Sequence, residues 1–151
     1  MSAVSEIQDQ QREYIMRGVE ERGVRLVRLW FTDILGNLKS FAISPAELEN
    51  ALEDGMTFDG SSSDGFSRVQ ESDVLAMPDP NTFEVLPWGD PKAVEARVFC
   101  DIHNLDGTPF EGDPRQVLRR NLGVAHDRGF TFYISPDIEF FYFAPPGRGQ
   151  L

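Results

Sequence analysis

The sequence has very little cysteine and no long apolar run. Cys100 is the one cysteine among 151 residues, so an internal disulfide framework and a cysteine-rich zinc site are both excluded. The longest apolar run covers only a few residues, which excludes a membrane-spanning helix. The first residues also lack the charged, apolar and small-residue regions of a secretory signal peptide. We therefore expect a cytoplasmic protein.

Basic residues are scarce as well. The chain has 14 Lys and Arg against 25 Asp and Glu, which gives a formal net charge of -11 at pH 7. This balance argues against nucleic acid and against an anionic membrane as partners. It suits small cations as ligands, although most acidic proteins carry such a charge without binding any.

Several motifs of known enzyme sites are missing. The sequence contains neither a Gly-x-x-x-x-Gly-Lys-Ser/Thr phosphate loop nor a Gly-x-Ser-x-Gly nucleophile turn. His103 and His126 have no ligand partner at metal spacing, so we expect both at the surface. Cys100 lies on the apolar face of a predicted strand and reads as a packed core thiol.

The sequence contains clear patterns for several helices and strands. Polar caps and glycine stops predict three helices, from Ser5 to a stop at Gly23, from Ser44 to Gly55, and from Asp113 to Gly129. Apolar runs and alternation predict strands over Val24–Phe31, Leu38–Ile43 and Val94–Asp101, more weakly over Phe83–Trp88, and over Phe130–Ile134 followed by Ile138–Phe143. Residues 33–37 read as a hairpin connection, whereas Phe58–Asp73 and residues 101–113 read as irregular.

This order of elements predicts an α+β unit over residues 1–112. A new helix and a strongly apolar strand then begin, and two such elements cannot bury their apolar faces alone. We therefore expect the start of a second, truncated domain.

The first candidate site is the polar segment Phe58–Phe66. Asp59 and Asp64 offer carboxylates to a cation or an amine, and Asp73 closes the segment with Glu71. The alternative is an ordinary surface loop, although its length exceeds the usual two to six residues.

The second candidate site is Asp137 with Glu139. Two positions apart on a strand, these side chains share one face, with backbones about 6–7 Å apart. Buried carboxylates must be paired or bind metal, and oxygen ligands suit Mg²⁺ or Mn²⁺. The alternative is an edge strand with its polar face in water, which Phe141 and Phe143 on the same face disfavour.

A series of short motifs resembles the N-terminal portion of bacterial type I glutamine synthetase. The motifs are Arg-Leu-Trp-Phe-Thr-Asp-Ile-Leu-Gly-Asn-Leu-Lys at 28–39, Phe-Asp-Gly-Ser-Ser at 58–62, Glu-Ser-Asp at 71–73, Met-Pro-Asp-Pro at 77–80, Cys-Asp-Ile at 100–102, Asp-Pro-Arg at 113–115 and Ile-Glu-Phe-Phe at 138–141. They follow in the family's order and cover about residues 10–143. The resemblance implies an N-terminal helix over residues 1–22, a β-grasp domain over 23–112 and the start of the catalytic domain over 113–151.

The resemblance also implies a reaction. ATP phosphorylates the side-chain carboxylate of glutamate, and ammonia then displaces the phosphate, with two divalent metals (Mg²⁺ or Mn²⁺) at the site. By motif, Asp59 and Asp73 are the catalytic acids at the ammonium site and Ser62 is their substrate-binding neighbour. Asp137 and Glu139 are similar to metal ligands. In the family this loop enters the site of an adjacent subunit in stacked homo-oligomeric rings.

Two departures from the family pattern bear on activity. The family usually has Glu where this chain has Asp137, which shortens the side chain by one methylene group. The remaining metal ligands, the nucleotide pocket and the glutamate-binding arginines of the family would lie beyond Leu151. We therefore expect the isolated chain to be inactive.

Three alternatives remain open at this point. One is a γ-glutamyl amide ligase of the same family that acts on a polyamine or another amine. A second is a non-catalytic β-grasp interaction module, which the exposed apolar strand that it would leave disfavours. The third is an acidic α+β protein without a site, which the ordered motifs disfavour.

Overall fold

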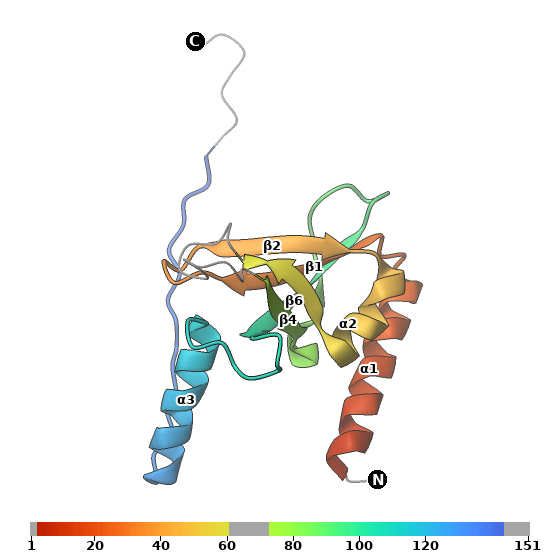
Figure 1. Cartoon of the computed structure of the whole chain (residues 1–151). Coiled ribbons are helices and arrows are strands. Elements are labelled where there is room, and N and C mark those ends of the chain that lie inside the picture. Colours follow the sequence, from red (N-terminus) through yellow and green to blue (C-terminus); the bar gives the residue numbers. More distant parts are fainter. Residues whose placement is uncertain (1–2, 61–72, 144–151) are drawn as a thin grey trace.

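The computed structural model describes residues 3–60 and 73–143, with side chains from residue 10 onward (Figure 1). In chain order the elements are α1 (Ala3–Glu21), β1 (Leu26–Thr32), β2 (Leu38–Ile43), η1 (Pro45–Glu47), α2 (Leu48–Asp54), β3 (Met56–Asp59), β4 (Asp73–Pro78), η3 (Pro80–Thr82), β5 (Glu84–Val85), β6 (Glu95–His103) and α3 (Pro114–Asp127). None of the described helices is long and apolar enough to cross a membrane.

The strands form one mixed sheet, which confirms the predicted α+β class. Its order is β2-β1-β6-β4-β3, with β5 also paired to β6. β1 and β6 run parallel in the middle, and the other pairs are antiparallel. The rings of Phe41 on β2 and Phe58 on β3 lie 5.2 Å apart, so the two edge strands approach each other and the sheet is strongly curled.

The core lies on one face of this sheet. Alternation along β1 buries Val27, Leu29 and Phe31 on that face. The matching positions of β6 are buried as well, including Cys100, which confirms its prediction as a core thiol. α1 and α2 lie side by side and cover this face with a second set of buried side chains, Ile15, Val19, Leu48 and Ala51 (Figure 1).

The predicted hairpin at residues 33–37 is confirmed, and one buried carboxylate organises it. Asp33 accepts hydrogen bonds from the backbone nitrogens of Leu35 (3.0 Å) and Asn37 (2.8 Å) and from the Asn37 side chain (3.1 Å). Lys39 Nζ lies 3.6 Å from its second oxygen. Burial alone would raise the pKa of Asp33, but these hydrogen bonds and the Lys39 charge hold it below its usual range.

The three predicted helices are present, with small shifts at their ends. α1 begins at Ala3, two residues before the predicted cap. The Glu47 carboxylate accepts from the Ser44 backbone nitrogen (3.2 Å), as the predicted capping box requires. At the third helix Asp113 accepts from the Arg115 backbone nitrogen (3.0 Å).

Several predictions about strands were wrong. The weak strand at Phe83–Trp88 shrinks to Glu84–Val85, and β6 runs on into residues predicted to be irregular. β3 and β4 were missed, because Gly60 and the polar residues around it obscured the short alternating stretches on either side.

The apolar stretches Phe130–Ile134 and Ile138–Phe143 are not strands in the described structure. Both are irregular, with Phe132 65% and Ile138 78% exposed. A strand needs a neighbour to accept and donate its backbone hydrogen bonds, and the described sheet places none beside these stretches. The apolar stripe of α3 is also largely exposed, with Leu118 at 56%.

Candidate functional site

The sheet brings Asp59 and Asp73 together. Asp59 ends β3, Asp73 begins β4, and the two residues are direct partners in the antiparallel pairing. Directly opposed residues have Cβ atoms about 4.5–5.5 Å apart. Both side chains are exposed and belong to the face of the sheet opposite the core. The two predicted catalytic acids thus form one pair.

Local packing explains why these carboxylates face outward. Phe58 precedes Asp59 and packs its ring 4.8 Å from that of Phe31, against the core. Val74 follows Asp73 and is buried. Because successive side chains on a strand point to opposite faces, each of these apolar neighbours directs its aspartate outward.

A glycine sets the start of β3. Gly55 has φ 76° and ψ -178°, a backbone conformation that favours glycine. A Cβ at this position would lie 2.5 Å from Met77 Sδ and 3.0 Å from the Ala76 carbonyl oxygen. The chain can therefore leave α2 and lie closely against β4 only because residue 55 has no side chain.

The Asp59–Asp73 pair has a defined chemistry. Two like charges directly opposite on a sheet repel each other and destabilise it. A cation placed between them relieves that repulsion, and a carboxylate can accept a proton from a bound ammonium or amine. The arrangement can therefore hold a small cation.

Other predicted residues of this site lie outside the described residues. These are Ser62, Asp64 and Glu71. The substrate-binding role of Ser62 therefore stays a prediction.

Asp137 and Glu139 lie apart from any sheet in the described chain. Both are exposed in the extended segment that follows α3 (Figure 1). Among residues 3–60 and 73–143, no three His, Cys, Asp or Glu side chains gather closely enough to hold a metal ion. Two carboxylates do not complete the six-oxygen shell of Mg²⁺. A metal site that uses Asp137 and Glu139 needs further ligands from elsewhere.

An ionic cluster that the sequence analysis missed joins β6 to α3. Arg115 contacts both Asp79 and Asp101, and Arg119 also contacts Asp101. Asp113 is buried beside them, and this burial raises its pKa although hydrogen bonds from Ile102 and Arg115 lower it. Asp79, Asp101 and Arg115 stand in three of the motifs quoted above, and no local pattern in the sequence predicts that these motifs meet.

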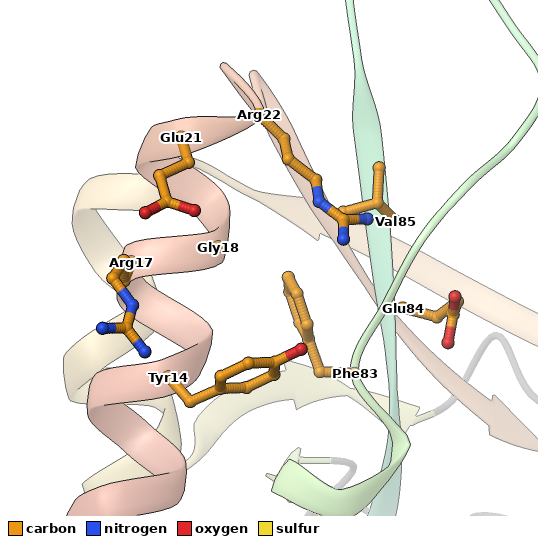
Figure 2. A pocket seen from close by; sticks show the side chains of 8 residues that line it. All are labelled: Tyr14, Arg17, Gly18, Glu21, Arg22, Phe83, Glu84 and Val85. Atoms are coloured by element: carbon orange, nitrogen blue, oxygen red, sulfur yellow. The ribbon is translucent and has the colours of Figure 1, made fainter.

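A small pocket lies between α1 and β5 (Figure 2). Its volume is about 120 Å³, and Gly18 leaves part of its wall as bare backbone. Tyr14 reaches from α1 toward Phe83, and Arg22 reaches from the end of the helix toward Val85 (Figure 2). None of the residues that line this pocket is a predicted site residue.

Comparison with known proteins identifies the family. The family model described as "Glutamine synthetase, beta-Grasp domain" matches residues 23–105. The chain is 58% identical over 139 residues to the glutamine synthetase of Mycolicibacterium smegmatis, which covers 91% of this chain. It is 57% identical over 146 residues to that of Mycobacterium tuberculosis, which covers 95% of this chain. These matches span about a third of the relatives' length (31% and 33%).

Solved structures agree with the fold. A GmaS–ADP complex superposes with a TM-score of 0.65 at 26% identity, over 76% of this chain and 26% of that one. The Plasmodium falciparum glutamine synthetase gives a TM-score of 0.69 at 24% identity, over 81% of this chain and 23% of that one. The family match, which covers residues 23–105 and so more than half of the chain, shows that the chain belongs to the glutamine synthetase family.

Proposed function

We propose that this chain is the N-terminal part of a glutamine synthetase, which joins ammonia to glutamate with ATP as co-substrate. The observation that carries the proposal is the direct pairing of Asp59 with Asp73 in a domain that matches the family. The similarity to the Mycolicibacterium smegmatis enzyme over 91% of the chain supports it.

In this proposal the Asp59–Asp73 pair handles ammonium. The pair attracts the cation, and Asp59 accepts one of its protons, which leaves neutral ammonia with a free electron pair. That electron pair attacks the side-chain carbonyl carbon of phosphorylated glutamate, the carbon–oxygen bond to phosphate breaks, and the nitrogen gives its second surplus proton to the departing phosphate. Ser62 is assigned to the same substrate site.

Asp137 and Glu139 are the proposed protein ligands of divalent metal. A divalent metal (Mg²⁺ or Mn²⁺) held there would supply neutralisation of charge on the transferring phosphoryl group. Calorimetric titration of a longer protein with Mn²⁺ tests the assignment at residue 137. Asp137→Glu should keep or tighten binding, because the longer side chain reaches the metal more directly, and a clear loss of affinity would contradict the ligand role.

The remaining parts of the active site are proposed to lie outside this chain. The isolated chain should therefore form no glutamine. We also propose that the whole protein assembles as a homo-oligomer of stacked rings, in which the segment after Asp59 reaches the site of an adjacent subunit.

A hybrid enzyme tests this function. In it, the chain replaces the corresponding N-terminal residues of the Mycolicibacterium smegmatis glutamine synthetase, to which it is 58% identical. We expect ATP-dependent glutamine formation from glutamate and ammonium at a rate near that of the parent enzyme. A soluble, assembled hybrid enzyme that forms no glutamine would contradict the proposal.

The same assay separates ammonia from a larger amine as substrate. A polyamine is also cationic, so the paired carboxylates alone accept either. If the hybrid enzyme used a polyamine in preference to ammonium, while the parent enzyme did not, this chain would carry the determinant for an amine ligase.

A further inference from the structure

Three large apolar side chains are exposed where β1 turns into β2. Ile34 is 55% exposed, Leu35 67% and Leu38 52%. They lie within five positions of one another in a chain whose formal net charge is -11. We call these three residues the apolar tip. Single exposed apolar residues are ordinary on a protein surface, whereas a group of them marks a surface that contacts another molecule.

The turn holds the apolar tip in one conformation. The fully buried Asp33 carboxylate accepts hydrogen bonds from the backbone nitrogens of Leu35 and Asn37. In the backbone, the Asp33 nitrogen donates to the Asn37 carbonyl (3.1 Å), and the Gly36 nitrogen donates to the Asp33 carbonyl (3.0 Å). A surface that is already ordered loses little conformational entropy when it binds. The turn is therefore suited to docking.

The apolar tip lies at the same end of the sheet as Asp59 and Asp73. β1 is parallel to β6, β6 is antiparallel to β4, and β4 is antiparallel to β3, so β1 and β3 run in the same direction. The tip follows the end of β1, and Asp59 is the last residue of β3 (Figure 1). The rings of Phe31 and Phe58, close to those two ends, lie 4.8 Å apart. The tip and the carboxylate pair therefore belong to one end of the curled sheet.

We propose that the apolar tip docks on an adjacent subunit, the same one whose active site receives the segment after Asp59. This inference rests on the proposed function, in which the carboxylate pair at this end of the sheet serves a site of a second copy. Since the tip and the pair share this end, the copy that reaches the pair also removes the three apolar side chains from water. Such a contact joins unlike surfaces of successive copies, which is the kind of contact that closes into a ring.

The assembly of the hybrid enzyme tests this contact. The double substitution Ile34→Ser and Leu35→Ser removes apolar area from the tip but leaves the backbone hydrogen bonds of the turn in place. Sedimentation is measured at a urea concentration that partly dissociates the unsubstituted hybrid enzyme. We expect the apparent dissociation constant to rise at least about tenfold, because a few residues carry most of the binding energy of an interface. An unchanged dissociation constant would overturn the proposal.

The isolated chain separates docking from folding. The same double variant should keep the melting temperature of the unsubstituted chain, since both side chains are more than half exposed. A clearly lower melting temperature would assign the tip to the stability of the hairpin and would contradict the docking role.

An exposed aromatic residue at the other end of the sheet provides the matched control. Trp88 is 67% exposed in the loop that joins β5 to the start of β6, opposite the end that carries the tip. The Trp88→Ser hybrid enzyme should assemble as the unsubstituted one does. Equal weakening by this variant and by the double variant would show a general effect of lost apolar surface and would contradict the proposal.

Cross-linking identifies what covers the tip. The photoreactive residue p-benzoylphenylalanine replaces Leu35 in the assembled hybrid enzyme, and illumination should join two chains into a product of double mass on a denaturing gel. A product joined only within one chain would show that the rest of the same protein covers the tip, and would overturn the assignment to a second copy. An assembled hybrid enzyme that forms no glutamine would instead contradict the proposed function, and the mass of the cross-linked product would still decide what the tip contacts.

Discussion

Asp59 and Asp73 are direct partners across β3 and β4, with both carboxylates on the exposed face of the sheet. Thirteen residues lie between them in the sequence. A pair of like charges in this arrangement works against the stability of the sheet. Its presence in a domain that matches the glutamine synthetase β-grasp family suits a site that binds a cation.

Neutralising one member of this pair should stabilise the isolated chain. Asp73→Asn removes the repulsion with Asp59, and we expect the free energy of unfolding to rise by about 0.2–1 kcal/mol. Urea denaturation measures this change in the free energy of unfolding. The exposed Glu111→Gln, in the loop after β6, is the control for the change in net charge and should have no such effect. Destabilisation by Asp73→Asn would mean that the carboxylate has a structural partner.

Gly55 should tolerate no side chain. Gly55→Ala places a Cβ against Met77 and the Ala76 carbonyl, and we expect a loss of about 3 kcal/mol in the free energy of unfolding. Gly36→Ala is the matched control, because its φ of 81° is similar but a Cβ there meets nothing within 4 Å. That variant should lose about 1 kcal/mol. Equal losses would contradict the close approach of Gly55 to β4.

Asp33 should make the hairpin sensitive to acid. Its pKa in the folded chain lies below the ordinary value of 3.8, so its carboxylate stabilises the fold above that pH. This contribution is lost as pH falls through the lower folded pKa. Asp33→Asn should be less stable than the unsubstituted chain at pH 7, and should lose less stability on acidification. The comparison uses urea denaturation at pH 7 and at about pH 3. Identical pH profiles would exclude this role.

Cys100 should be unreactive while the chain is folded. Burial, and secondarily the charge of Asp101, raises the pKa of this thiol well above its usual range. Alkylating reagents attack the thiolate, so the rate of modification should follow the rate at which the chain opens. Addition of urea should steeply increase the rate at which Cys100 is alkylated. Rapid modification in the absence of denaturant would show that β6 is accessible.

Local signals in the sequence predicted much of the fold. The hairpin at Asp33–Asn37 and the caps at Ser44 and Asp113 depend on hydrogen bonds between residues two to four apart, which a sequence displays directly. The α+β class followed from the order of these elements. The resemblance supplied the roles of Asp59 and Asp73.

Contacts between residues far apart in the sequence could not be predicted in this way. Arg115 and Asp79 lie 36 positions apart in the sequence, and no local pattern predicts that their side chains are in contact. β3 and β4 were hidden, because a four-residue strand beside a polar segment has too few alternating positions. The apolar residues of Phe130–Phe143 predicted buried strands, but they are exposed in the described chain, because apolarity does not say whether a pairing strand is present.

The ammonium dependence of the hybrid enzyme tests the central claim most directly. The rate of glutamine formation is measured against ammonium concentration for the unsubstituted hybrid enzyme, for Asp59→Asn and for the control Glu111→Gln. We predict that Asp59→Asn lowers kcat/KM for ammonium by about 10²–10⁴, since a positioned base contributes on that order, and that Glu111→Gln changes nothing. An Asp59→Asn hybrid enzyme with the same ammonium dependence as the unsubstituted one would contradict the assignment of the Asp59–Asp73 pair as the ammonium site.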